Sequence, residues 1–209
     1  MSAPDPVDAV AEPARLRVVR SRGAVDLPAA ERAVGDLLRA LGRDPREPHL
    51  TDTPRRVADA YAELLSPPPF DLTTFPNDEG YNELVMAMSI PVQSLCEHHL
   101  LPFTGVAHIG YLPGDRILGL SKLARVLDLF ARDLQVQERL TQQVADWLQE
   151  NLAPRGVGVV LEAEHLCMSI RGAAKPGATT VTSAIRGHFR DDPRGRAEAL
   201  SLIHAPRFR

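Results

Sequence analysis

The chain has 209 residues, 44% of them hydrophobic, with a formal net charge of -3 and a pI near 6.2. A chain of this length accommodates one sizeable core, and its charge gives no bulk electrostatic reason to expect nucleic acid or an anionic membrane as a partner. No apolar run approaches the roughly 20 residues needed to cross a bilayer, and residues 1–13 lack the pattern of a secretory signal, so we expect a soluble, cytoplasmic protein.

The N-terminal part divides into two regions by composition. Residues 1–27 carry Pro, Ala and charge without sustained periodicity, which predicts a flexible arm. Residues 28–66 are predicted to be a helical region, and its first helix is indicated by apolar residues at helical spacing from Ala33 to Leu41, ending at Gly42.

A second helix is predicted at Thr53, which can act as the N-cap with Pro54 at the first helical position. Arg55 and Arg56 then lie in the first turn, where the helix dipole disfavours cations. Two interpretations are open: the arginines are simply solvated, or they meet an external anion.

Residues 67–209 are expected to form the main domain, beginning with a loop up to Glu79 that is rich in Pro, Asp and Thr. Apolar residues at helical spacing predict two stripes, one behind Ser121 as N-cap up to Leu134 and one over 136–148. Residues 190–209 are predicted to form a terminal helix. Composition and alternation predict strands over 84–92, 104–112, 157–168 and 179–189.

Three polar residues stand at the start of the predicted helix after residue 120. Ser121, Lys122 and Arg125 combine a hydroxyl, the unpaired N–H groups of a helix start and two cations on one side. This combination suits an oligophosphate, although two exposed cations on a surface helix are also commonplace.

The densest chemistry lies in Cys96-Glu97-His98-His99. Positions three apart in a helical turn share a side, so Cys96 and His99 can converge on one ion. His98 then points elsewhere and is free for proton chemistry. The alternative is a chance histidine pair beside a buried structural cysteine.

A third ligand is available seventy residues later. On the predicted strand 157–168, alternation places His165 and Cys167 on the apolar face, where a thiolate needs a cation. Cys167 can therefore join Cys96 and His99 around one zinc ion. Three protein ligands leave a fourth position open, as in catalytic zinc sites, where the pKa of bound water falls to about 7.

These segments together resemble GTP cyclohydrolase I. The likeness extends from about residue 31 to about residue 204 and is densest between 94 and 189. The matching stretches are TPRRV (53–57), SLCEHHLLPF (94–103), IGYLP (109–113), LGLSKLAR (118–125), QVQERLT (135–141), EHLCM (164–168), RG (171–172) and TVTS (180–183).

The resemblance implies an α+β T-fold with an antiparallel sheet and paired helices in each subunit. Sheets from several subunits close into a barrel, typically in a homodecamer with active sites between subunits. The implied reaction opens GTP at guanine C8, releases formate and gives 7,8-dihydroneopterin triphosphate, the first step of tetrahydrofolate and pterin biosynthesis.

The resemblance also implies a role for each candidate residue. An acid must protonate guanine N7 opposite the metal, which suits His165, and His98 is the second proton shuttle. The resemblance implies that Zn²⁺ is bound by Cys96, His99 and Cys167. It implies that the guanine edge is recognised by Gln137 and Glu138, and that the triphosphate is bound by Ser121, Lys122, Arg125, Arg171 and Arg56.

Two other functions compete with this interpretation. A nitrile reductase of the same fold uses one nucleophilic cysteine and NADPH without zinc, which the Cys/His/Cys trio disfavours. A non-catalytic zinc-stabilised binding protein would leave His98 and His165 dispensable.

Overall fold

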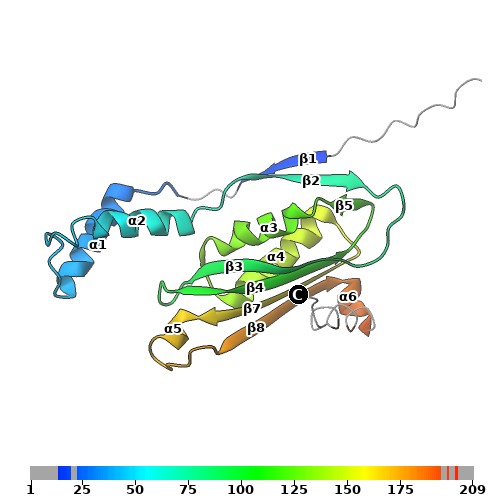
Figure 1. Ribbon diagram of the computed structural model, residues 1–209. Coiled ribbons are helices and arrows are strands. Elements are labelled where there is room, and N and C mark those ends of the chain that lie inside the picture. Colours follow the sequence, from blue (N-terminus) through cyan, green and yellow to red (C-terminus); the bar gives the residue numbers. More distant parts are fainter. Residues whose placement is uncertain (1–13, 20–22, 194–196, 198–200, 202–209) are drawn as a thin grey trace, which may run out of the picture.

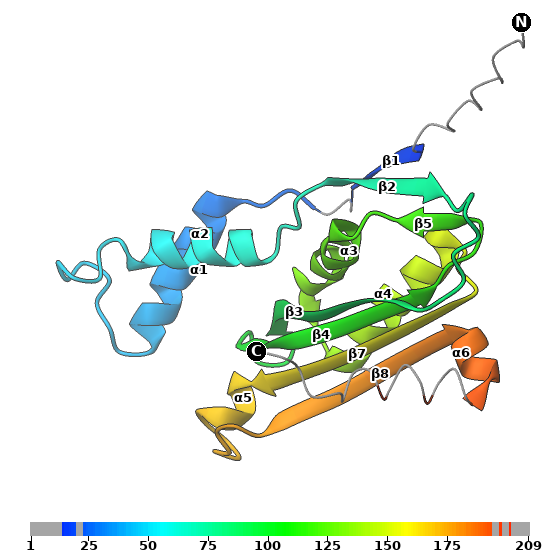
Figure 2. The ribbon, with the colours of Figure 1, turned by 45° about the vertical axis from the view of Figure 1, so that its right-hand side comes forward.

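The computed structural model describes residues 14–19, 23–193, 197 and 201. In both ribbon views, helices α3 and α4 lie between a five-stranded sheet and a smaller three-stranded sheet, while α1 and α2 lie together at one end (Figures 1 and 2). In chain order the elements are β1 Ala14–Val18, α1 Leu27–Ala40, α2 Thr53–Leu64, β2 Phe70–Pro76, β3 Val85–Cys96, β4 Pro102–Leu112, β5 Arg116–Leu118, α3 Ser121–Ala131, β6 Leu134–Gln135, α4 Gln137–Leu152, β7 Gly156–His165, α5 Leu166–Ser169, β8 Thr179–Gly187 and α6 His188–Asp191.

The five-stranded sheet has the order β6-β3-β4-β7-β8. Neighbouring strands are antiparallel except for β6, which pairs in parallel with β3. The sheet is therefore mixed, whereas a purely antiparallel sheet was predicted. The α+β class is confirmed. The register pairs Phe103 of β4 with His165 of β7, which brings the end of β7 beside the segment that follows Cys96.

The hydrophobic core forms between the buried face of the five-stranded sheet and the apolar faces of helices α3 and α4. One face of β4 buries Ala107, Ile109 and Tyr111, and α3 and α4 bury residues such as Leu127 and Leu148 against it. Each such leucine contributes roughly 1.5–3 kcal/mol when it is fully buried. The predicted periods of two for strands and 3.6 for helices are therefore confirmed in this part of the chain.

The predictions for the N-terminal segments need two corrections. Ala14–Val18, inside the expected flexible arm, forms β1 and pairs with β2, so it belongs to a sheet. Phe70–Pro76, inside the expected loop, is β2 itself, with Phe70, Leu72 and Thr74 buried on alternate positions. The prolines around β2 hid this short alternation, because proline is a strong signal for loops.

Several element boundaries also differ from the predictions. Thr53 and Ser121 are the first helical residues rather than N-caps, and neither preceding residue makes a side-chain cap hydrogen bond. The strand predicted over 157–168 ends at His165, and the one predicted over 179–189 ends at Gly187. Most of the predicted terminal helix over 190–209 lies outside the described residues.

The close approach of β4 and β7 depends on Gly105. A Cβ atom at this position would lie 1.9 Å from the carbonyl oxygen of Glu162 and 2.6 Å from the Cα of Ala163. Only a residue without a side chain fits, since both contacts are with backbone atoms. Among the described residues, no helix is long and apolar enough to span a membrane.

Candidate active site

The segment after Cys96 folds into a tight turn that carries three of the predicted site residues. The Cys96 carbonyl accepts hydrogen bonds from the backbone N–H groups of His99 (3.3 Å) and Leu100 (2.8 Å), which closes one helical turn. Leu100 then takes a positive φ of 55° and turns the chain into β4. From helix α2, the Tyr61 hydroxyl donates to the Leu100 carbonyl at 2.8 Å, so the turn is held from outside as well.

The turn and helix α5 bring three metal-ligating side chains together. One ligand atom from each of Cys96, His99 and Cys167 lies within 4.8 Å of the other two. Cys96 Sγ and His99 Nδ1 are 3.7 Å apart, close to the roughly 3.5 Å that tetrahedral zinc–sulfur and zinc–nitrogen bonds require. The predicted convergence is therefore present, but Cys167 reaches it from a helical turn, not from a strand face.

The surroundings of the Cys167 thiol bear on whether a cation can lie beside the two sulfur atoms. Burial raises the pKa of the Cys167 thiol, and the neighbouring Cys96 thiol raises it further. The positive charge of Arg171 lowers that pKa, so Arg171 lies near the group. Two sulfurs this close are stable as thiolates only with a positive ion between them, so the residues fit a soft divalent metal ion.

His98 also lies close to Cys96 and lines the same pocket as the three candidate ligands. Its Nδ1 is 3.9 Å from Cys96 Sγ, and its Nε2 is 3.8 Å from a carboxylate oxygen of Glu97. The side chain is 63% exposed. It therefore remains accessible to a ligand in solution.

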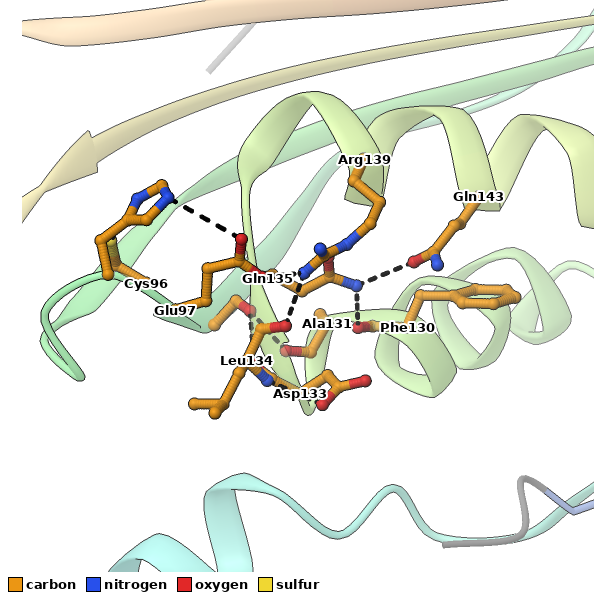
Figure 3. Close-up of polar contacts among 11 residues, drawn as sticks. Cys96, Glu97, Phe130, Ala131, Asp133, Leu134, Gln135, Arg139 and Gln143 are labelled. Carbon is orange, nitrogen blue, oxygen red and sulfur yellow. Dashed lines mark hydrogen bonds and ion pairs between the residues drawn. The ribbon is translucent and has the colours of Figure 1, made fainter.

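A hydrogen-bond network joins this turn to the start of α4 (Figure 3). Arg139 bonds both to the Glu97 carboxylate and, through Nε, to Gln135 Oε1 at 2.9 Å. Gln135 in turn donates to Gln143 Oε1 at 2.8 Å, and its carbonyl accepts from the Glu97 N–H at 3.0 Å. The short strand β6 thus fastens the first turn of α4 to the turn that carries the ligands.

His165 is held on two sides. Its ring stacks on Phe103 with centroids 4.6 Å apart and planes inclined by 12°, and its Nε2 is 2.8 Å from Gln137 Oε1. Burial lowers the pKa of His165, while the negative charge of Glu138 acts in the opposite direction. The nearby carboxylate therefore partly offsets the cost of a protonated imidazole in this position.

A pocket of about 240 Å³ collects these groups. It contains the three candidate metal ligands, His98, His165 and the two residues predicted to contact guanine, of which Glu138 is exposed and Gln137 is buried. Its lining residues are Cys96, His98, His99, Gln135, Val136, Gln137, Glu138, His165, Cys167, Met168 and Thr180.

The residues predicted to bind phosphate lie outside this pocket. Ser121 and Arg125 are exposed on the first turns of α3. Arg56 pairs with Asp52 at 2.9 Å on the surface of α2, and Arg55 pairs with Asp59 at 3.1 Å, so both first-turn arginines have carboxylate partners within the helix region. No lysine or arginine is among the residues that line the pocket in the described part of the chain.

Three supporting side chains were not predicted. Phe103 stacks on His165, Glu97 lies beside His98, and Arg139 bonds to Glu97. These contacts depend on strand register or helix packing that the sequence does not reveal. The pairing of Phe103 with His165 could have been found only by aligning the two strands.

The fold and the site define an α+β protein in which a group able to hold a metal ion lies in a pocket that also contains histidine side chains, which are able to transfer protons. A family model for GTP cyclohydrolase I matches residues 30–204. The chain belongs to the GTP cyclohydrolase I family and is an enzyme of this type, which confirms the resemblance found in the sequence.

Relatives support this at high identity. The GTP cyclohydrolase 1 of Mycobacterium ulcerans (strain Agy99) is 56% identical over 189 residues, covering 86% of this chain and 92% of the relative. That of Thermobifida fusca (strain YX) is 55% identical over 184 residues, covering 86% and 89%. A solved structure of an archaeosine synthase QueF-Like in the apo form is 16% identical over 50% of this chain and 93% of that chain, with a TM-score of 0.40, too low to establish a shared fold.

Proposed function

We propose that the chain catalyses the zinc-dependent opening of the guanine ring of GTP at C8, with release of formate and rearrangement to 7,8-dihydroneopterin triphosphate. The observation that carries the proposal is the convergence of Cys96, His99 and Cys167 in the pocket that also holds His98 and His165. The enzyme would act in the cytoplasm, where reducing conditions keep both thiols available for metal.

The residues divide the chemistry between them. When bound, zinc supplies a Lewis acid that activates water for attack at C8. His165 supplies the proton that N7 must receive for C8 to become electrophilic. Burial lowers the pKa of His165, and the charge of Glu138 opposes that shift. His98, exposed beside Cys96, exchanges the second proton with solvent or substrate.

Glu138 is the group that would select guanine. It is exposed in the first turn of α4 and lines the pocket. A carboxylate accepts hydrogen bonds from N1–H and the 2-amino group of guanine together, whereas adenine has no hydrogen on N1 and no 2-amino group.

The triphosphate requires a second copy of the chain. Among the described residues, no lysine or arginine lines the pocket, and Ser121, Lys122 and Arg125 lie at the start of α3 instead. We therefore propose that this group and Arg56 from one subunit, together with Arg171, complete the pocket of another. The edge strand β8 exposes Val181, and pairing of such edges would close subunit sheets into the barrel of a homodecamer.

Purified, zinc-loaded protein is expected to convert GTP into formate and a product that becomes a fluorescent pterin after oxidation. ATP should give neither product, because the adenine edge cannot satisfy Glu138. Formate is measured enzymatically and pterin by fluorescence after chromatography. Absence of both products from zinc-replete protein with GTP would reject the proposed reaction.

Lys122→Ala and Arg125→Ala are expected to raise the KM for GTP roughly 10- to 100-fold, because each removes a charge-assisted phosphate contact of about 1.5–3 kcal/mol. The kcat should change much less, since neither residue touches the guanine. Arg43→Ala, an exposed arginine after α1, is the matched control. Unchanged KM values in both variants would remove α3 from the phosphate site.

A further inference from the structure

The side chain of Gln137 is the most constrained polar group of the pocket. Gln137 is the first residue of α4 and is only 1% exposed. Its Nε2 lies 3.0 Å from the Leu161 carbonyl, 2.9 Å from the Thr180 carbonyl and 3.1 Å from Thr182 Oγ1. Backbone carbonyls only accept hydrogen bonds, so the atom between them must be the NH₂ group, and the amide has one orientation.

Two threonine hydroxyls settle the direction of the remaining bonds. Thr141 Oγ1 donates its only hydrogen to the Gln137 carbonyl at 2.8 Å. Thr182 Oγ1, 2.6 Å from Thr141 Oγ1, must then be the donor of that pair. Its lone pairs are left for the Gln137 amide, so the network has no freedom to reverse.

The amide oxygen of Gln137 therefore faces His165 Nε2 as an acceptor at 2.8 Å. An acceptor there requires a hydrogen on Nε2, while Phe103 covers the ring face. We propose that Gln137 is a positioning residue that fixes the ring orientation and Nε2–H form of His165, rather than a residue whose amide binds guanine. This inference rests on the proposed role of His165.

The geometry of α4 lets Gln137 position His165 while Glu138, the next residue, faces the substrate pocket. Successive residues of a helix point about 100° apart, so Gln137 and Glu138 face different directions. Gln137 is buried and has all its amide groups bonded within the chain, whereas Glu138 is exposed in the pocket. Guanine selection is thus left to Glu138 alone.

Gln137→Leu, which keeps the approximate shape but removes both bonding groups, is expected to lower kcat for pterin formation roughly 10- to 100-fold, as loss of a supporting hydrogen bond typically does. The KM for GTP should change by less than about threefold, since no ground-state contact is lost. Zinc content should equal that of the wild type. In a crystal structure of the variant, the His165 ring should leave its stacked position on Phe103.

Thr182→Val is the second variant, because it keeps the side-chain shape and removes only the hydroxyl that orients the amide. It should lower kcat in the same direction, and Thr182→Ser, which retains the hydroxyl, should restore it. Gln149→Leu is the matched control: it lies on the same helix, donates to the Pro154 carbonyl and does not line the pocket.

Two results would overturn the inference. One is a raised KM with unchanged kcat in Gln137→Leu, which would make Gln137 a substrate contact. The other is an unmoved His165 ring with wild-type kcat in Thr182→Val. Wild-type protein inactive on GTP would instead refute the proposed function, and the crystal structures would still decide whether Gln137 orients His165.

Discussion

Cys167→Ala is expected to abolish both zinc binding and pterin formation. Cys96 and His99 come from one turn, whereas Cys167 is the ligand delivered by a distant segment, so its removal leaves a two-residue chelate. A metal ion at the proposed site would contribute several kcal/mol of transition-state stabilisation, so activity should fall by about three orders of magnitude or more. Zinc bound per chain, measured by atomic absorption after dialysis, should fall to background.

The fold should survive this substitution. Cys167 is only partly buried in the short helix α5, so the loss of its thiol leaves a small cavity at most. Circular dichroism should match that of the wild type. His49→Ala, which removes an exposed imidazole that pairs with Glu47, is the control and should keep full zinc occupancy. Full occupancy in Cys167→Ala would show that the metal uses other ligands.

Gly105→Ala is expected to be the most destabilising single methyl addition in the sheet. The new Cβ would lie 1.9 Å from the Glu162 carbonyl oxygen, and neither strand can yield without breaking the β4–β7 ladder. Overpacking of this kind costs about 3 kcal/mol or more when only backbone can move. The free energy of unfolding, from urea titration monitored by circular dichroism, should fall by that amount.

Gly158→Ala is the matched control for this effect. Gly158 lies on β7 in the same ladder, but its nearest neighbour would be Phe189 Cδ2 at 3.8 Å, an ordinary contact. Its stability should stay within about 1 kcal/mol of the wild type, the small range of well-tolerated additions. Equal stability of Gly105→Ala and the wild type would mean that the two strands can separate at no cost.

Local sequence patterns predicted those parts of the protein that local physics determines. The Cys96 turn was predicted because three-residue spacing in a helical turn fixes the side that His99 shares. The buried strands around Ile109 and Val159 were predicted because alternation records which face is covered. In each case the signal and the structure involve neighbouring residues.

The failures have a physical origin in longer-range contacts. Strand β1 forms because β2 pairs with it, and no pattern within Ala14–Val18 predicts that pairing. Cys167 was expected on a strand face, but the chain bends into α5 directly after His165, where Ser169 bonds to the Glu164 carboxylate. The orientation of the Gln137 amide depends on acceptors on β7 and β8, two elements that are distant from Gln137 in the chain.

The two residues of β6 give the site a property that matters for redesign. Gln135 bonds to the turn that carries Cys96 on one side and to Arg139 of α4 on the other, so the proposed base-selecting carboxylate of Glu138 and the candidate metal ligands share one support. An engineer who repacks the start of α4 to accept a different nucleobase would therefore also shift the metal-binding loop. New specificity on this scaffold is more safely sought by changing Glu138 alone than by moving the helix that carries it.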